Sequence, residues 1–157
     1  MIDRRLIASL ALSASALVGI ALHEGYSDNA IIPVPGDVPT IGFGNTEGVK
    51  LGDKTTPPKA LGRLLKTAEK YEGAIKSCVF VRLSQNEYDA YTSLAYNIGT
   101  GAFCSSSLVK KLNAMDYDGA CAEILKWDKF KGKPLKGLTL RRQAEYQQCL
   151  GIGDGQT

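Results

Sequence analysis

The residues best suited to chemistry form two short motifs near the N-terminus. His23-Glu24-Gly25 directly follows an uncharged segment, and Thr40-Ile41-Gly42-Phe43-Gly44 begins sixteen residues after Glu24. A carboxyl group at the end of an apolar helix is poorly solvated, so its pKa rises and it can stay protonated at neutral pH. Glu24 is therefore our candidate general acid. The hydroxyl of Thr40, at the start of a predicted strand, is a candidate for holding a water molecule. His23 beside Glu24 is interpreted as an interfacial polar residue rather than a pH switch.

The segment before Glu24 is apolar but only weakly so. Leu6 to Leu22 carry no charge over seventeen residues, which is the short edge of what spans a bilayer. Arg4 and Arg5 would stay cytoplasmic, so the rest of the chain would face outward. Four interpretations compete: a cleaved signal peptide ending near Ala14-Ser15-Ala16, a permanent anchor, a buried soluble helix, and a signal anchor that inserts and later leaves the bilayer. We favour the last, because the many Ala and Ser residues make release from the bilayer thermodynamically accessible.

Composition and charge exclude several classes of protein. The chain has 157 residues, 44% hydrophobic and 22% charged, which suits one compact domain with a short appendage. It contains no Gly-rich phosphate loop or RNA-binding signature, and a net charge of +3 does not argue for nucleic acid. A basic run near the C-terminus indicates a solvated surface, which we favour, or a patch that meets an anionic polymer such as a bacterial wall. The run consists of Lys126, Lys129, Lys131, Lys133, Lys136, Arg141 and Arg142.

The four cysteines, Cys78, Cys104, Cys121 and Cys149, lack the spacing of a zinc site. If the chain is exported, an even count of separated cysteines fits two disulfides; otherwise they are reduced, buried residues. Four cysteines allow three pairings. Their spacing on adjacent predicted helices favours Cys104–Cys121 with Cys78–Cys149.

Beyond residue 25 the pattern changes from turns to helices. Residues 26–58 are rich in Pro and Gly, with short strands expected around Thr40–Phe43 and Ile31–Val34. Apolar periodicity predicts a long helix from Lys59 to Lys76. Ser84-Gln85-Asn86-Glu87 is a capping box, so the next helix starts at Ser84 and ends at Gly99. Three more helices are expected: one carrying Leu108, Val109, Leu112 and Met115; one carrying Ala120, Cys121, Ile124, Leu125 and Trp127; and one from near Thr139 to about Leu150.

In this order the motifs resemble the phage-type lysozyme family of glycoside hydrolases. The family carries a helix-borne Glu-Gly, a hairpin motif similar to Thr40-Ile41-Gly42-Phe43-Gly44, a segment similar to Tyr96-Asn97-Ile98-Gly99, and a C-terminal pattern similar to Arg141-Arg142-x-x-Glu145. The resemblance covers residues 23–150, and the weakly apolar N-terminus resembles that of the signal-arrest-release subgroup of endolysins. The family resemblance implies an α+β, two-lobe fold: a small β-hairpin lobe and a larger helical lobe joined by a long helix, behind an N-terminal signal-anchor helix.

The domain boundaries follow from this resemblance. Residues 1–22 would be the signal-anchor and release segment, residues 23–150 the lysozyme domain, and residues 151–157 a flexible tail. By the same resemblance, Tyr96 and Asn97 of this chain would line the sugar cleft, although helix packing and capping explain these residues equally well.

One position departs from the family pattern. Where the family has an aspartate six residues before the threonine, this chain has Val34. Asp37, which occupies the family's glycine position, is our candidate for the second carboxylate, with Asp28 as the other local candidate. Alternatively Asp37 only caps a turn, as Asp often does.

The resemblance implies hydrolysis of the β-1,4 bond between N-acetylmuramic acid and N-acetylglucosamine in peptidoglycan. Catalysis would rest on Glu24, Thr40 and Asp37, without cofactor, metal or nucleic acid. The partners would be peptidoglycan strands and, through residues 6–22, the inner membrane before release into the periplasm, with the protein a monomer. Two alternatives remain: a chitinase or lytic transglycosylase on the same fold, and a wall-binding protein without catalysis, which the missing aspartate would favour.

Overall fold

The computed structural model describes residues 1–152, which form two compact units. We call residues 14–69 the hairpin unit, and residues 1–13 together with those from 70 onward the helical unit. Helices and small two-stranded sheets make up both, so the α+β class is confirmed. Of the predicted flexible tail, residues 153–157 lie outside the described residues.

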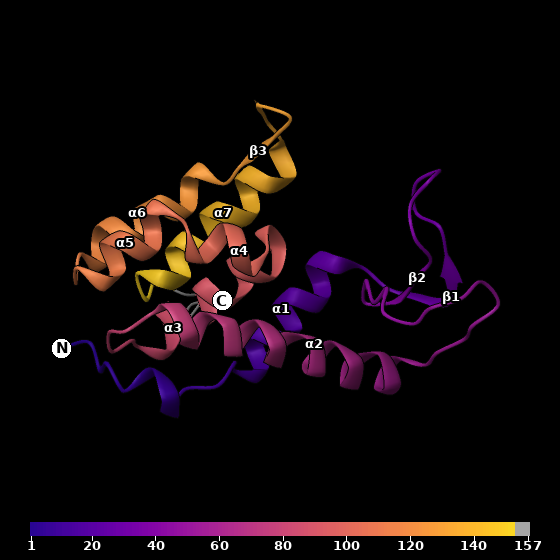
Figure 1. The fold of residues 1–157 in the computed structure, drawn as a ribbon, viewed down its shortest axis with the longest axis horizontal. Helices are drawn as coiled ribbons and strands as arrows, with labels where there is room; N and C mark the ends of the chain where they lie inside the picture. The colour runs from indigo at the N-terminus through magenta and orange to yellow at the C-terminus, as the bar shows by residue number, and fades with distance from the viewer. Residues whose placement is uncertain (153–157) are drawn as a thin grey trace. The chain divides into compact units, whose positions relative to one another are not determined.

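The hairpin unit combines a short helix, an antiparallel strand pair and the start of a long helix (Figure 1): α1 (Ala14–Glu24), β1 (Ser27–Ile31), β2 (Thr40–Gly42) and α2 (Pro57–Cys78). The strand expected at Ile31–Val34 is wrong, because β1 ends at Ile31 and residues 33–37 form a turn. Pro33 and Pro35 have no N–H to donate to a strand ladder, which ends the pairing there.

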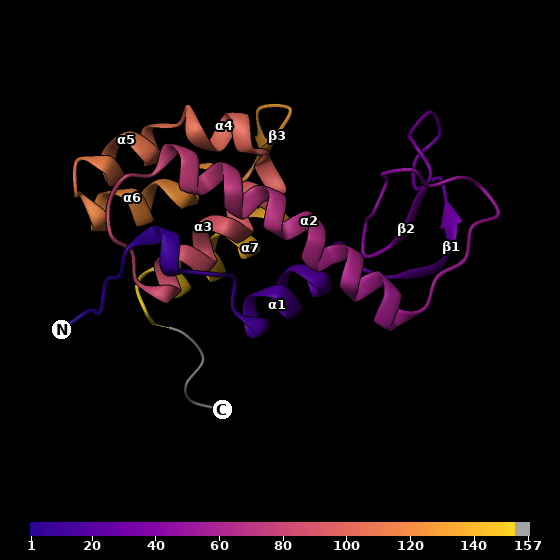
Figure 2. The same ribbon diagram turned by 60° about the horizontal axis from the view of Figure 1, so that its bottom comes forward.

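The helical unit receives the C-terminal part of α2 and contains the remaining elements (Figure 2). These are η1 (Ile7–Ser9), α3 (Gln85–Ile98), α4 (Thr100–Cys104), α5 (Ser107–Asn113), α6 (Tyr117–Glu123), η2 (Ile124–Lys126), β3 (Lys129–Phe130), β4 (Lys133–Pro134) and α7 (Lys136–Cys149). The buried core includes Tyr88, Tyr91, Leu94, Phe103 and Leu108, and α3 packs against α7.

Helix boundaries follow local hydrogen bonding where the signal is strong. Ser84 accepts from the Glu87 N–H while the Glu87 side chain accepts from the Ser84 N–H, so the predicted capping box is confirmed. Met115 does not belong to a helix, because α5 ends at Asn113 and Met115 takes a left-handed φ of 62° in the following turn. The last helix begins at Lys136 rather than near Thr139, after a two-stranded hairpin that the sequence did not predict.

The predicted disulfide pairing is wrong, although two disulfides are present. Cys78 bonds to Cys104 and Cys121 to Cys149, with Cα–Cα distances of 5.7 and 5.8 Å. The fold brings α4 back onto the end of α2, where the Cys104 sulfur also lies 3.7 Å from the Ala74 carbonyl oxygen. Pairing is therefore decided by which helices pack together, and not by nearness along the chain.

We expect the second disulfide to stabilise the helical unit substantially. Its sequence separation is 28 residues, for which loop-closure entropy gives roughly 3 to 4 kcal/mol. Replacing Cys121 and Cys149 together by Ala should lower the free energy of unfolding in urea by about 3 kcal/mol. An unchanged urea midpoint, with the Cys78–Cys104 disulfide intact, would show that this crosslink does not constrain the unfolded chain.

Two members of the basic run are not on the surface. Arg141 and Arg142 are buried in α7 and lie 3.2 and 3.1 Å from the carboxylate of Glu145, which also accepts from the Ser93 hydroxyl. The solvated-surface interpretation is wrong for this pair, because the acid three and four residues later compensates both charges inside the protein. The lysines of the run remain exposed.

The N-terminal segment is not one continuous helix. A 3-10 turn at Ile7–Ser9 is followed by residues without regular secondary structure, and α1 starts only at Ala14. Within residues 1–152, no helix has both the length and the apolar character required to cross a membrane, so the predicted signal-anchor helix is not confirmed. Leu10, between these helices, belongs to the core of the helical unit.

Candidate active site

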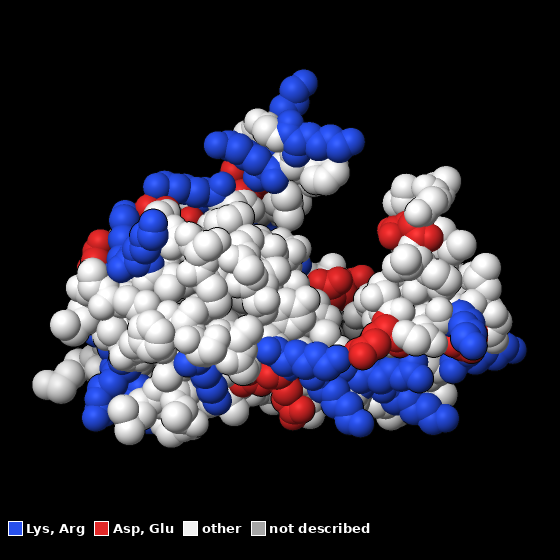
Figure 3. Space-filling view, viewed as in Figure 1, with Lys and Arg blue, Asp and Glu red and all other residues white. Residues whose placement is uncertain are grey.

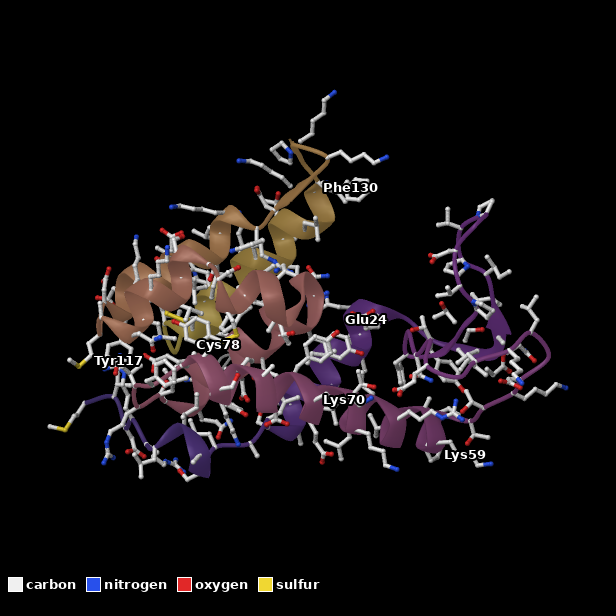
Figure 4. The ribbon with its side chains drawn as sticks, in the orientation of Figure 1. Glu24, Lys59, Lys70, Cys78, Tyr117 and Phe130 are labelled. Carbon is white, nitrogen blue, oxygen red and sulfur yellow. A yellow bond between two sulfur atoms is a disulfide. The ribbon has the colours of Figure 1, made fainter. Side chains whose placement is uncertain are left out.

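Glu24 is positioned by the buried face of α1. Ala16 and Ile20 are buried on this helix and stand eight and four residues before Glu24, a spacing that puts all three side chains on one helix face. Glu24 itself is half-buried, and Gly25 ends the helix with a left-handed φ of 71°. Figure 4 labels Glu24 at this end of α1. The apolar helix thus ends in a half-buried carboxylate.

The turn after β2 lies directly against Glu24. A methyl group placed on Gly44 would stand 3.0 Å from Oε2 of Glu24 and 3.7 Å from its Cβ, and Gly44 has a φ of +77°. Only a residue without a side chain allows the backbone to approach the carboxylate this closely in that conformation. The structure therefore brings together the two motifs that the sequence singled out.

The same turn is held from its other side by α2. Ile41 is buried and exchanges two backbone hydrogen bonds with Asn45, which closes the turn. A methyl group on Gly42 would stand 2.8 Å from Cβ of Ala60, so this strand end packs tightly on the long helix. Tyr26 and Phe43 add a ring contact with centroids 5.1 Å apart. The turn that faces Glu24 is thus fixed by backbone pairing and by close packing.

The other two predicted site residues lie toward the far end of β2. Thr40 is half-buried, opposite Ile31 in the sheet, and its hydroxyl donates to the Val38 carbonyl at 3.3 Å. Asp37 is exposed in the loop between the strands, where its Oδ1 accepts from the Val38 N–H at 2.9 Å. Asp37 therefore does stabilise its own turn, which was the alternative interpretation of this residue.

Asp28, the other candidate for the second carboxylate, lies on β1. Its Oδ1 accepts from the side-chain amide of Asn29 at 2.7 Å, and its backbone carbonyl accepts from Thr55. This carboxylate is exposed and engaged with its sequence neighbour. Among residues 1–152, no group of three His, Cys, Asp or Glu side chains is placed to hold a metal ion.

The helical unit contains a polar arrangement that sequence reasoning did not derive. Arg142 is 0% exposed and donates from Nη2 to Oδ1 of Asn97 at 2.8 Å. Because this oxygen faces the buried guanidinium, the NH2 group of the exposed Asn97 side chain keeps its donors for other partners. The signal in the sequence was Glu145, three residues after Arg142, a spacing that allows an ion pair on one helix face.

Comparisons with known proteins agree with these motifs. The sequence model of the phage lysozyme family matches residues 21–145 of this chain. An endolysin of Acyrthosiphon pisum secondary endosymbiont phage 1 is 46% identical over 138 residues, covering 85% of this chain and 94% of the relative. A SAR-endolysin of Pseudomonas phage phiKMV is 36% identical and covers 87% of each chain. The solved endolysin from Escherichia coli O157:H7 phage FAHEc1 superposes with a TM-score of 0.81 at 33% identity, covering 92% of this chain and 96% of that one. With its helix-borne Glu24 held against the glycine turn of a small hairpin, this chain belongs to the phage lysozyme family.

Proposed function

We propose that this protein is an endolysin, a muramidase that hydrolyses the β-1,4 bond between N-acetylmuramic acid and N-acetylglucosamine in peptidoglycan and so lyses the host cell. The observation that carries the proposal is the close approach of the Glu24 carboxylate to Gly44, where an added methyl group would stand 3.0 Å from Oε2. This approach places the residue at the family's acid position beside the family's hairpin motif. Membership of the phage lysozyme family and similarity to endolysins over most of the chain support the same function.

In this proposal Glu24 is the general acid. Cleavage of a glycosidic bond requires protonation of the leaving oxygen as positive charge develops on the sugar ring. Glu24 is half-buried at the end of an apolar helix, beside the turn that carries Gly44, and in this proposal its carboxyl group supplies that proton. Thr40 would orient the attacking water, since its hydroxyl oxygen can accept a hydrogen bond while its hydrogen is given to Val38.

We propose Asp37 as the second carboxylate, which helps Thr40 to position water. Asp37→Asn should lower the rate of peptidoglycan clearing about tenfold to a hundredfold. Its stability should stay unchanged, because an Asn side chain can still accept from the Val38 N–H. Asp28→Asn is the matched control and should clear at the rate of the wild type. Equal rates for all three proteins would show that Asp37 only stabilises its own turn, through its hydrogen bond from the Val38 N–H.

The Gly44 contact leads to a second expectation, with Gly48 as control. Both glycines have a left-handed φ, +77° and +69°, but only Gly44 has a neighbour within 4 Å of an added methyl group. Alanine at either position should cost about 1 kcal/mol of stability through backbone strain. Gly44→Ala should also displace the Glu24 carboxylate and slow clearing about tenfold more than Gly48→Ala does. If both variants clear equally fast, the contact does not position the acid.

We also propose that residues 1–22 act first as a membrane signal anchor and later as part of the folded protein. The similarity to SAR-endolysins supports the first role. Contacts of residues 4–13 with the rest of the helical unit support the second: Arg4 pairs with the buried carboxylate of Glu87 at 2.6 Å, and the Leu12 N–H donates to Glu72 at 2.7 Å. The protein would thus be tethered to the host inner membrane, with its C-terminus outward, and then be released into the periplasm as a monomer.

In the same proposal, residues 23–150 are the lysozyme domain and the last residues a tail without catalytic function. Clearing of a suspension of purified peptidoglycan tests the function itself. The wild-type protein, with its disulfides formed, should clear the suspension and release new reducing ends. A suspension that stays turbid while the protein pellets with it would instead indicate a wall-binding protein without catalysis.

A further inference from the structure

The excess of positive over negative charge in the chain lies on one short segment. Four lysines stand between residues 128 and 136, namely Lys129, Lys131, Lys133 and Lys136, against the single acid Asp128. This excess of three charges equals the net charge of the whole protein, +3, so the remainder of the chain is balanced. All four lysines are exposed, and none has an ion-pair partner among residues 1–152. Their ammonium groups are therefore available to an external anion.

The segment is a projecting hairpin whose strands bury nothing. β3 and β4 pair Lys129 with Pro134 and Phe130 with Lys133, and all four residues are exposed. Figure 1 shows the hairpin standing out from the helices of its own unit, and Figure 3 shows blue basic side chains gathered there. The segment connects η2 to α7. A loop that only joined these two elements would not need four lysines, and it could be shorter.

An aromatic ring lies between the charges. Phe130 is 60% exposed, and the Lys131 Nζ lies 5.5 Å from the centroid of its ring. Cross-strand pairing puts Phe130 and Lys133 side by side on one face of the hairpin. An exposed aromatic ring flanked by ammonium groups can stack on the CH face of a sugar while the ammonium groups pair with nearby carboxylates.

We propose that the β3–β4 hairpin, together with Lys136 at the start of α7, is an accessory binding surface for peptidoglycan, separate from the Glu24 site. The partner is the intact wall polymer, whose sugars carry peptide stems with free carboxylates; the lysines pair with these carboxylates and Phe130 contacts the glycan. This inference rests on the proposed function for its choice of polyanion. The hairpin holds the enzyme on its insoluble substrate and takes no part in bond cleavage.

Binding is measured by co-sedimentation with purified insoluble peptidoglycan, in a Glu24→Gln background so that the wall is not consumed. The test variant replaces Lys129, Lys131, Lys133 and Lys136 by Gln, and the matched control replaces the exposed lysines Lys50, Lys54, Lys59 and Lys66 by Gln. Both lose four charges, so net charge is the same. At low salt the test variant should bind about tenfold or more weakly than the control, and the difference should vanish near 1 M salt, where charges are screened within about 3 Å. Phe130→Ser should weaken binding at all salt concentrations.

Three results would overturn the proposal: binding at the wild-type level by both variants, an equal loss of binding in both, or loss of binding to anionic lipid vesicles in the test variant while wall binding is unchanged. The last result would identify a membrane surface as the partner. Clearing by the protein with Glu24 intact tests the proposed function independently. With Glu24 present, the test variant should hydrolyse a short soluble glycan at the wild-type rate while clearing the insoluble wall more slowly.

Discussion

Glu24→Gln is expected to abolish clearing of peptidoglycan, lowering the rate about a thousandfold or more. The amide keeps the shape of the carboxyl group and can still lie against Gly44, but it has no proton to give to the leaving oxygen. The loss should appear in the turnover rate, while co-sedimentation with the wall stays at the wild-type level. Turbidity and sedimentation of the same preparations measure both quantities.

The matched control is Glu47→Gln, an exposed glutamate in the same unit. It should clear the wall at close to the wild-type rate, and both variants should unfold at the wild-type temperature. A Glu24→Gln protein that lyses normally would mean that the acid lies elsewhere. Equal, undetectable clearing by wild type and variant would favour the wall-binding alternative.

Replacing Leu6–Leu22 by a strongly hydrophobic membrane anchor should abolish lysis while leaving the protein exported. A permanent anchor keeps residues 4–13 in or beside the bilayer and so removes their contacts with the rest of the helical unit. Arg4 then no longer neutralises Glu87, whose side chain is 3% exposed, and the Ser13 N–H no longer reaches the buried Asp89 at 3.0 Å. A buried carboxylate that loses its partner is strongly destabilising, on the order of 3 to 5 kcal/mol.

The control for this experiment is the native chain behind a cleavable signal peptide, so that residues 1–22 arrive outside without a permanent tether. It should lyse cells as soon as it is exported, and formation of both disulfides reports export of either protein. Normal lysis by the anchored variant would contradict the release proposal. It would not affect the assignment of Glu24, which the purified proteins test.

Local signals in the sequence were sufficient where structure depends on a few neighbouring residues. The capping box at Ser84 is two hydrogen bonds within four residues, so its motif located the start of α3. The glycines of the Thr40–Gly44 motif likewise indicated a tight turn, and the structure adds that Gly42 and Gly44 face two different neighbours. Helix-borne Glu24 next to that turn could be anticipated from the resemblance of the motifs to a family.

Features that depend on packing could not be read in the same way. Glu72, Glu87 and Asp89 look like surface acids on a helix, yet each is buried and binds the N-terminal segment. The disulfide partners depend on how the helices fold back, which no spacing rule specifies. The β3–β4 strands have two residues each, too short to show any periodicity.

The most direct test of the central claim is the chemical identity of the ends that the wild-type protein creates in purified peptidoglycan, measured by mass spectrometry of the released fragments. The account predicts fragments with N-acetylmuramic acid at the reducing end, each heavier by one water than an anhydro product, and none from Glu24→Gln. Fragments ending in an anhydro sugar would show a lytic transglycosylase, and reducing ends of N-acetylglucosamine would show cleavage of the other bond. Either result would contradict the muramidase assignment.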